Sequence, residues 1–385
     1  MADLDAILNE AVASGDAPFL VAMTGNADGV TWSGHAGDRV PGTPASEDTV
    51  FRIFSMTKAI GSLAAMILID RGKLGIETPV ADVIPAFADI RVLEGHDDEG
   101  KPITREPRTT ATIRHLATHT TGFVYEIWNE DMPRYMEATE HPSILTGLKA
   151  ALMGPLMFDP GTRWDYGQGI DWLGQAVEAV DGRRIDQFCK EEIFDPLGMP
   201  DTRFELEGTM ADRLADVAAR GEDGAFVDMD LAPPPDPEFY GMGHALYSTA
   251  PDYMRFLRML LNRGSLDGAT VLSPDGVDTL LENHIGDLRL GLMKTVAPPM
   301  SADVDMFPGH EKTHSFGFMR MEVDVPGMRS AGAQAWAGVL NSHYWFDPAR
   351  DVAGLIMTQL LPFVDERFMG VYERFEKGVY ENLDA

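Results

Sequence analysis

The residues with the clearest potential for chemistry are Ser55 and Lys58, which form an S-x-x-K pair. Apolar residues then recur at three- and four-residue steps, which predicts a helix over 55–71 that stops at Gly72. Side chains three residues apart share a helix face, so the hydroxyl and the amine would meet at the positive end of the helix dipole. This pairs a nucleophile with a base whose pKa burial would lower. The alternative is an N-cap serine followed by a solvated lysine.

Two later segments add groups that could act on the same substrate. Tyr166 and Gln168 follow a Pro-Gly turn and precede a predicted helix, so a phenol and an amide sit on one loop. Trp336 and Gly338 lead into a predicted strand, where a glycine allows a ligand to approach backbone N–H groups. The alternatives are a packed, hydrogen-bonded tyrosine and a glycine that marks a strand bulge.

The three motifs together resemble the serine β-lactamase and penicillin-binding-protein superfamily, whose signature is S-x-x-K, Y-x-N and K-T-G. The version with W-x-G as third motif is similar to the family VIII carboxylesterases, which have the class C β-lactamase fold. The likeness covers nearly the whole chain, because three further segments match family segments. These are I-R-H-L-A-T-H-T-T-G (113–122), P-G-T-R-W-D-Y (160–166) and G-M-G-H-A-L-Y-S-T-A (241–250).

The resemblance implies a serine carboxylesterase mechanism. Ser55 would attack an ester carbonyl, Lys58 and Tyr166 would share its proton, and either of the two could be the immediate base. Backbone N–H groups of Ser55 and Val339 would form the oxyanion hole, and no cofactor is implied. The remaining residues that it implies for substrate binding are Gln168, Trp336, Gly338, Tyr125, Trp128, Phe239 and Tyr240.

Two departures from the family pattern bear on the substrate. Gln168 stands where β-lactamases usually have asparagine, and Trp336 stands where a cation would hold a substrate carboxylate. The loss of that cation favours a neutral, short-chain acyl ester over a penicillin-type carboxylate. A β-lactamase, a D-amino-acid peptidase and an acyltransferase of the same fold remain alternatives.

Other classes of protein are less consistent with the sequence. His310 and His314 form a literal H-E-x-x-H, but zinc chemistry needs both on one helix, and a strand is predicted to start at 315. Arg320 occupies the position of a third histidine ligand, so we expect no metal. No G-x-S-x-G occurs, which argues against an α/β-hydrolase. A non-catalytic binding module has no need of the Ser55, Lys58 and Tyr166 set.

Charge and composition limit the partners. The net charge of −30 argues against nucleic acid and anionic membrane surfaces, both of which need basic patches. The acidic N-terminal segment does not look like a signal peptide, no stretch resembles a membrane span, and Cys189 is the only cysteine. We therefore expect a cytoplasmic enzyme that acts on a small-molecule ester. Its oligomeric state is open.

Elements at both ends of the chain must position these residues. The sequence predicts an α/β (α+β) fold in which one antiparallel sheet is built from both termini and flanked by helices. The expected domains are 1–75 with 245–385 for the sheet and 76–244 for a mainly helical insertion, with the active site between them. Predicted strands cover 19–24, 30–35, 315–323, 338–346 and 352–360. Predicted helices cover 3–14, 55–71, 112–122, 170–180, 186–194, 249–262, 273–282 and 363–380.

Overall fold

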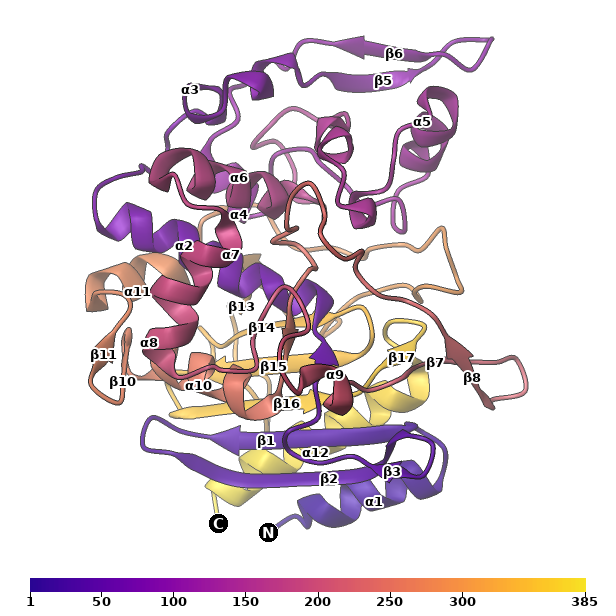
Figure 1. Ribbon diagram of the computed structural model, residues 1–385, viewed down its shortest axis with the longest axis vertical. Helices are drawn as coiled ribbons and strands as arrows, with labels where there is room; N and C mark the ends of the chain where they lie inside the picture. The colour runs from indigo at the N-terminus through magenta and orange to yellow at the C-terminus, as the bar shows by residue number, and fades with distance from the viewer.

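A large antiparallel sheet forms the base of the molecule (Figure 1), in a computed structural model that describes residues 1–385. Its strand order is β12-β13-β14-β15-β16-β1-β2-β3, so strands from the two ends of the chain meet where β1 pairs with β16. The α/β fold with a sheet from both termini is thereby confirmed. The sheet consists of β1 (Phe19–Gly25), β2 (Val30–Val40), β3 (Thr43–Pro44), β12 (Lys312–His314), β13 (Met319–Met321), β14 (Gln334–Gly338), β15 (Ser342–Asp347) and β16 (Val352–Met357).

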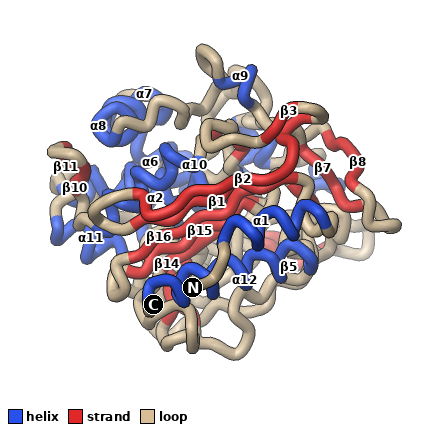
Figure 2. The backbone as a smooth tube through the Cα atoms, turned by 90° about the horizontal axis from the view of Figure 1, so that it is seen from below, coloured by secondary structure: helices blue, strands red, loops and turns tan.

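Helices cover both faces of this sheet. On one face α1 (Leu4–Ala13) and α12 (Glu366–Leu383) pack against each other and onto the strands, as the view from below shows (Figure 2). On the other face α10 (Ala250–Leu261) lies across β1, β15 and β16. Its N-cap Thr249 accepts the N–H of Asp252, and Pro251 occupies its first turn, as expected for a helix start.

The middle of the chain consists mainly of short helices and two hairpins. Its strands are β5 (Val92–His96) with β6 (Pro102–Arg105) and β7 (Val217–Arg220) with β8 (Phe226–Met229). Its helices are α3 (Val80–Val83), α4 (Ile113–Ala117), α5 (Asp131–Thr139), α6 (Gly169–Asp181), α7 (Ile185–Cys189), α8 (Asp195–Leu197) and α9 (Met210–Arg213). Strand β7 also pairs in parallel with β17 (Leu360–Leu361). The domain boundaries near 75 and 245 stay a prediction.

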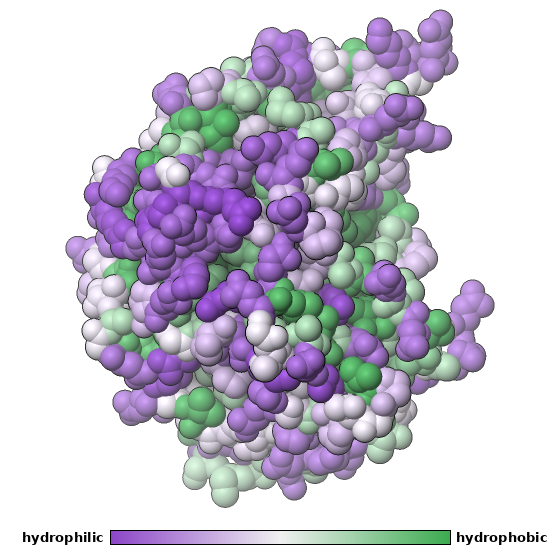
Figure 3. Space-filling view, in the orientation of Figure 1, coloured by the Kyte–Doolittle hydropathy of each residue, from purple (hydrophilic) through white to green (hydrophobic).

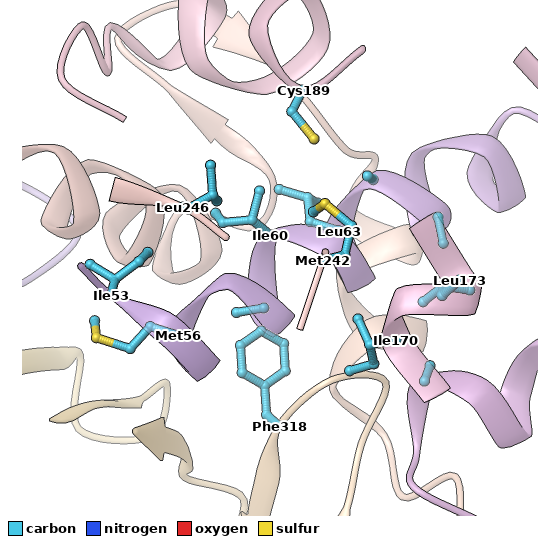
Figure 4. Packing of buried hydrophobic residues seen from close by; sticks show 14 of the residues in the cluster. Ile53, Met56, Ile60, Leu63, Ile170, Leu173, Cys189, Met242, Leu246 and Phe318 are labelled. Carbon is cyan, nitrogen blue, oxygen red and sulfur yellow. The ribbon is translucent and has the colours of Figure 1, made fainter. Parts of the chain in front are cut away.

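Helix α2 (Thr57–Asp70) runs through the interior between these parts, and residues 57–68 are all buried. It packs on α6 and on α11 (Pro274–Leu281). Ile60 and Leu63 of α2 meet Ile170 and Leu173 of α6, together with Met242 (Figure 4). This packing holds the start of α2 at a fixed place beside the sheet.

Three strand predictions are wrong in detail; one of them is 352–360, because β16 ends at Met357 and β17 begins at Leu360. The alternating segment 315–323 predicts one strand, but its first residues form a tight turn that follows β12, and within the segment only β13 is a strand. Gly317 lies in that turn at φ +107°, a conformation that glycine adopts without strain. The predicted strand 338–346 is likewise divided, because β14 ends at Gly338 and β15 begins at Ser342. None of the helices combines the length and the apolar character that a bilayer crossing requires.

Candidate active site

Ser55 lies at the entrance to α2, in a single turn of tighter helix, η1 (Phe54–Met56). Phe54 directly before it has φ +40°, which is a strained backbone conformation for a residue with a side chain. Strand β14 passes close by: a methyl group added to Gly338 would lie 2.4 Å from the carbonyl oxygen of Ile53. The serine is therefore held between the start of α2 and the end of β14.

Lys58 is 1% exposed and its amine faces Ser55. Its Nζ lies 3.0 Å from Ser55 Oγ and 2.7 Å from the carbonyl oxygen of Gly243. Burial lowers the pKa of Lys58 to about 7, although the carboxylate of Asp171 raises it in part. An amine with such a pKa is partly neutral near pH 7 and can accept a proton.

Tyr166 completes the group of side chains around Ser55. Its hydroxyl accepts a hydrogen bond from Trp336 Nε1 at 3.0 Å, and Lys58 Nζ lies 4.8 Å from the centre of its ring. Burial raises the pKa of Tyr166 above its usual range, while hydrogen bonds with Ser55 and Trp336 act in the opposite direction. The three residues of the predicted catalytic set thus lie together, although they come from distant parts of the chain.

An apolar cavity opens beside Ser55. Ten of its thirteen lining residues are hydrophobic. In the view of Figure 3, apolar residues gather along the hollow between the upper and lower parts of the molecule. The lining consists of Phe54, Ser55, Tyr125, Glu126, Ile127, Trp128, Ile144, Leu145, Tyr166, Leu231, His244, Met300 and Val339.

The structure brings some of the predicted binding residues to this cavity and not others. Tyr125, Trp128 and Val339 line it. The Val339 N–H, directly after β14, donates no hydrogen bond within the chain, so it is free to bind an oxyanion. Trp336 contributes through its bond to Tyr166, and Gly338 allows β14 to approach Ser55.

Five predicted binding residues do not line the cavity: Trp336 and Gly338, whose contacts are given above, and three others. Gln168 is buried and donates a long hydrogen bond of 3.4 Å to the carbonyl oxygen of Ala151. Phe239 is part of the hydrophobic core. Tyr240 donates to Glu205 at 2.9 Å, in a different pocket. A position near a motif therefore does not by itself bring a side chain into the cavity.

Sequence reasoning missed three polar residues around the site. Glu126 lines the cavity and accepts a 2.6 Å hydrogen bond from Ser143 Oγ. His244 also lines it, and burial lowers its pKa to about 3, so the imidazole is neutral. Asp171 lies behind Lys58 and is completely buried. A signal for Asp171 was present, since a carboxylate interrupts the apolar start of a predicted helix.

The H-E-x-x-H segment does not form a helix. His310 lies in a bend and His314 ends strand β12, so the two side chains are not placed on one helix face. His314 is buried, and its ring packs against His119 and Trp336. The geometry that a zinc protease would build from this motif is therefore not formed here.

Known proteins resemble the chain over almost its full length. The family model described as Beta-lactamase matches residues 4–377. Lovastatin esterase of Penicillium rubens is 27% identical, over 89% of this chain and 88% of its own. Monacolin J acid methylbutanoyltransferase of Aspergillus terreus is 29% identical, over 88% and 83%. Among solved structures, unliganded simvastatin synthase (LovD) from Aspergillus terreus has a TM-score of 0.85 at 27% identity and covers 99% of each chain. The chain belongs to the Beta-lactamase family.

Proposed function

We propose that the chain is a serine esterase that cleaves neutral carboxylic esters through an acyl-Ser55 intermediate. The observation that carries this proposal is the 3.0 Å contact between Lys58 Nζ and Ser55 Oγ, at a cavity that Ser55 and Tyr166 both line. An activated hydroxyl at the edge of a cavity is the arrangement that covalent catalysis needs. The similarity to lovastatin esterase is consistent with it.

The bond changes follow from the positions of these groups. Ser55 Oγ forms a bond to the acyl carbon while its proton passes to neutral Lys58. The N–H groups of Ser55 and Val339 bind the oxyanion, and each such donor contributes about 10²–10³-fold to the rate. Tyr166 delivers a proton to the departing alkoxide, with Lys58 resupplying it, and the alcohol leaves. Water then attacks the acyl-enzyme, releases the carboxylic acid and restores the Ser55 hydroxyl.

The lining of the cavity supports a neutral substrate. Glu126 is the only acidic residue in the lining, and burial keeps His244 neutral near pH 7. No lining residue supplies a cation that would pair with a substrate carboxylate, whereas Glu126 would repel one. The remaining lining is mostly apolar and suits an uncharged acyl or alcohol group.

Hydrolysis of p-nitrophenyl acetate and butyrate tests the proposal, together with the intact mass after treatment with an organophosphonate. We expect Ser55→Ala to lose about 10⁴-fold or more in kcat, because the nucleophile is absent. The wild type should gain one phosphonate and the variant none. The matched control is Ser62→Ala on the same helix, whose buried Oγ has no hydrogen-bond partner. Turnover that survives Ser55→Ala would refute the acyl-serine route. If a chelator then abolished this turnover, the result would favour a metal site at the histidine motif instead.

Transfer of the acyl group to an alcohol is a second candidate. The similarity to a methylbutanoyltransferase favours it, and so does the apolar cavity, which would hold an alcohol better than water. Adding 1-butanol to the p-nitrophenyl butyrate reaction distinguishes the two. Butyl butyrate formed in excess of butyrate would identify a transferase. Butyrate as the main product would identify an esterase.

A further inference from the structure

Asp171 is a buried carboxylate that the steps above do not use. It lies in the first turns of α6 and has no exposed surface. Its Oδ1 accepts the N–H of Gly243 at 2.7 Å, while its Oδ2 has no hydrogen-bond partner. A buried carboxylate with an unpartnered oxygen costs folding free energy, so its presence calls for a reason.

A short series of contacts links this carboxylate to the nucleophile. Gly243 donates its N–H to Asp171 and accepts a hydrogen bond from Lys58 Nζ with its carbonyl oxygen, at 2.7 Å in both cases. Lys58 Nζ in turn contacts Ser55 Oγ at 3.0 Å. A methyl group added to Gly243 would lie 2.8 Å from Asp171 Oδ2 and 2.9 Å from the Tyr125 hydroxyl. The position of Gly243, and with it that of the amine, therefore depends on Asp171.

Asp171 is also the one opposite charge among the titratable groups that face Lys58. Those groups are Tyr125 and Tyr166 from the loops above it, His119, His244 beside Gly243, and Asp171 from α6. Burial lowers the pKa of both histidines and raises the pKa of both tyrosines, so all four are neutral near pH 7. Burial also raises the pKa of Asp171 to about 6, and the positive charge of Lys58 lowers it.

We propose that Asp171 is a positioning residue for the proposed acyl transfer: it holds Gly243, and through the Gly243 carbonyl the Lys58 amine, in place, and it puts a buried negative charge behind that amine. The inference rests on the proposed function, because Lys58 needs to accept a proton only if Ser55 is the nucleophile that becomes acylated. Without the negative charge, burial alone would act on the amine, and Lys58 would become a weaker base.

The test compares the wild type with Asp171→Asn, which retains an oxygen for the Gly243 N–H but removes the charge. The titration of Lys58 is followed by NMR of protein labelled with 13C at the lysine ε-carbon, with Lys58→Arg used to assign its signal. We expect the midpoint to fall by about one pH unit or more, because an opposite charge nearby has been lost. The pH at which Ser55 phosphonylation reaches half its maximal rate should fall with it.

Asp252→Asn is the matched control. Asp252 is a buried carboxylate of α10, and burial raises its pKa to about 6 as well, but it binds Thr202 and the Asp201 N–H. Its loss should destabilise the fold and leave the Lys58 midpoint unchanged. A merely structural role of Asp171 would give the same result in both variants.

The outcomes separate the inference from the proposed function. An unchanged Lys58 midpoint in Asp171→Asn would overturn the inference. A wild type that takes up no phosphonate would refute the proposed function, and the NMR midpoint would still decide whether Asp171 sets the basicity of Lys58. If Asp171→Asn does not fold, Gly243→Ala replaces it, since the added methyl group displaces the carboxylate. The midpoint should then fall too, and an unchanged value would again contradict the inference.

Discussion

At the scale of single residues, the indole of Trp336 shows how a motif residue can differ from its expected use. The resemblance implies that Trp336 binds substrate, although it stands where related enzymes have a cation that holds a substrate carboxylate. In the structure the Trp336 Nε1 donates to the Tyr166 hydroxyl at 3.0 Å, and the centres of the two rings lie 4.9 Å apart. A donor on the phenol oxygen stabilises the negative charge that develops when Tyr166 gives up its proton. We therefore expect Trp336 to act through Tyr166 and not on the substrate.

Replacing Trp336 with phenylalanine removes this donor and retains an aromatic ring. We expect kcat for p-nitrophenyl butyrate to fall about tenfold with KM little changed, because one hydrogen bond of about 1–1.5 kcal/mol is lost in the transition state. Trp32→Phe is the control, since the Trp32 indole makes only a long, exposed contact of 3.5 Å with Asp5. A rise in KM at constant kcat would instead assign Trp336 to substrate binding.

At the scale of elements, the site depends on how closely β14 approaches η1. The strand carries Gly338 next to Ile53, and Val339 follows with its free N–H. Any side chain at 338 would meet backbone rather than a flexible neighbour, so the strand itself would have to move. The distance between the two proposed oxyanion donors, Ser55 N–H and Val339 N–H, therefore depends on a residue without a side chain.

Gly338→Ala tests this dependence. The added methyl group would lie 2.4 Å from the Ile53 carbonyl oxygen, so β14 must shift away from Ser55. Displacement of one oxyanion donor should lower kcat about 10²-fold. Gly370→Ala in α12 is the control, because no atom lies within 4 Å of its added methyl group, and alanine favours a helix. Full activity of folded Gly338→Ala would show that β14 does not position the donor.

The elements also show what the sequence could predict. The helix from 55 onward and the sheet from both termini were predictable, because their apolar spacing is regular and the motifs follow a family order. The turn inside 315–323 was not, since the alternation continues through Gly317. Gln168 and Tyr240 do not line the cavity, because a motif fixes the position of the backbone and leaves the side-chain direction open. Asp171 was overlooked because its partner, Gly243, lies 72 residues away.

At the scale of the whole molecule, the acidic character extends into the active site. The net charge is −30, and the single acidic residue in the cavity lining is Glu126. Salt at 0.1 M screens charges that lie more than about 10 Å away, whereas Glu126 acts at short range on any molecule that enters the cavity. The global and the local charge both disfavour an anionic substrate, but only the local charge should persist at high salt.

Glu126→Gln separates these two contributions. We compare p-nitrophenyl hemisuccinate, whose acyl group carries a carboxylate, with neutral p-nitrophenyl butyrate at low salt and at 0.5 M salt. The ratio of kcat/KM for the anionic to the neutral ester should rise about fivefold in the variant, which corresponds to roughly 1 kcal/mol of repulsion near the surface. Glu373→Gln on α12 changes the net charge by the same amount and does not line this cavity, so it should leave the ratio unchanged. Equal effects of the two substitutions, both abolished by salt, would mean that the overall charge selects the substrate and Glu126 does not.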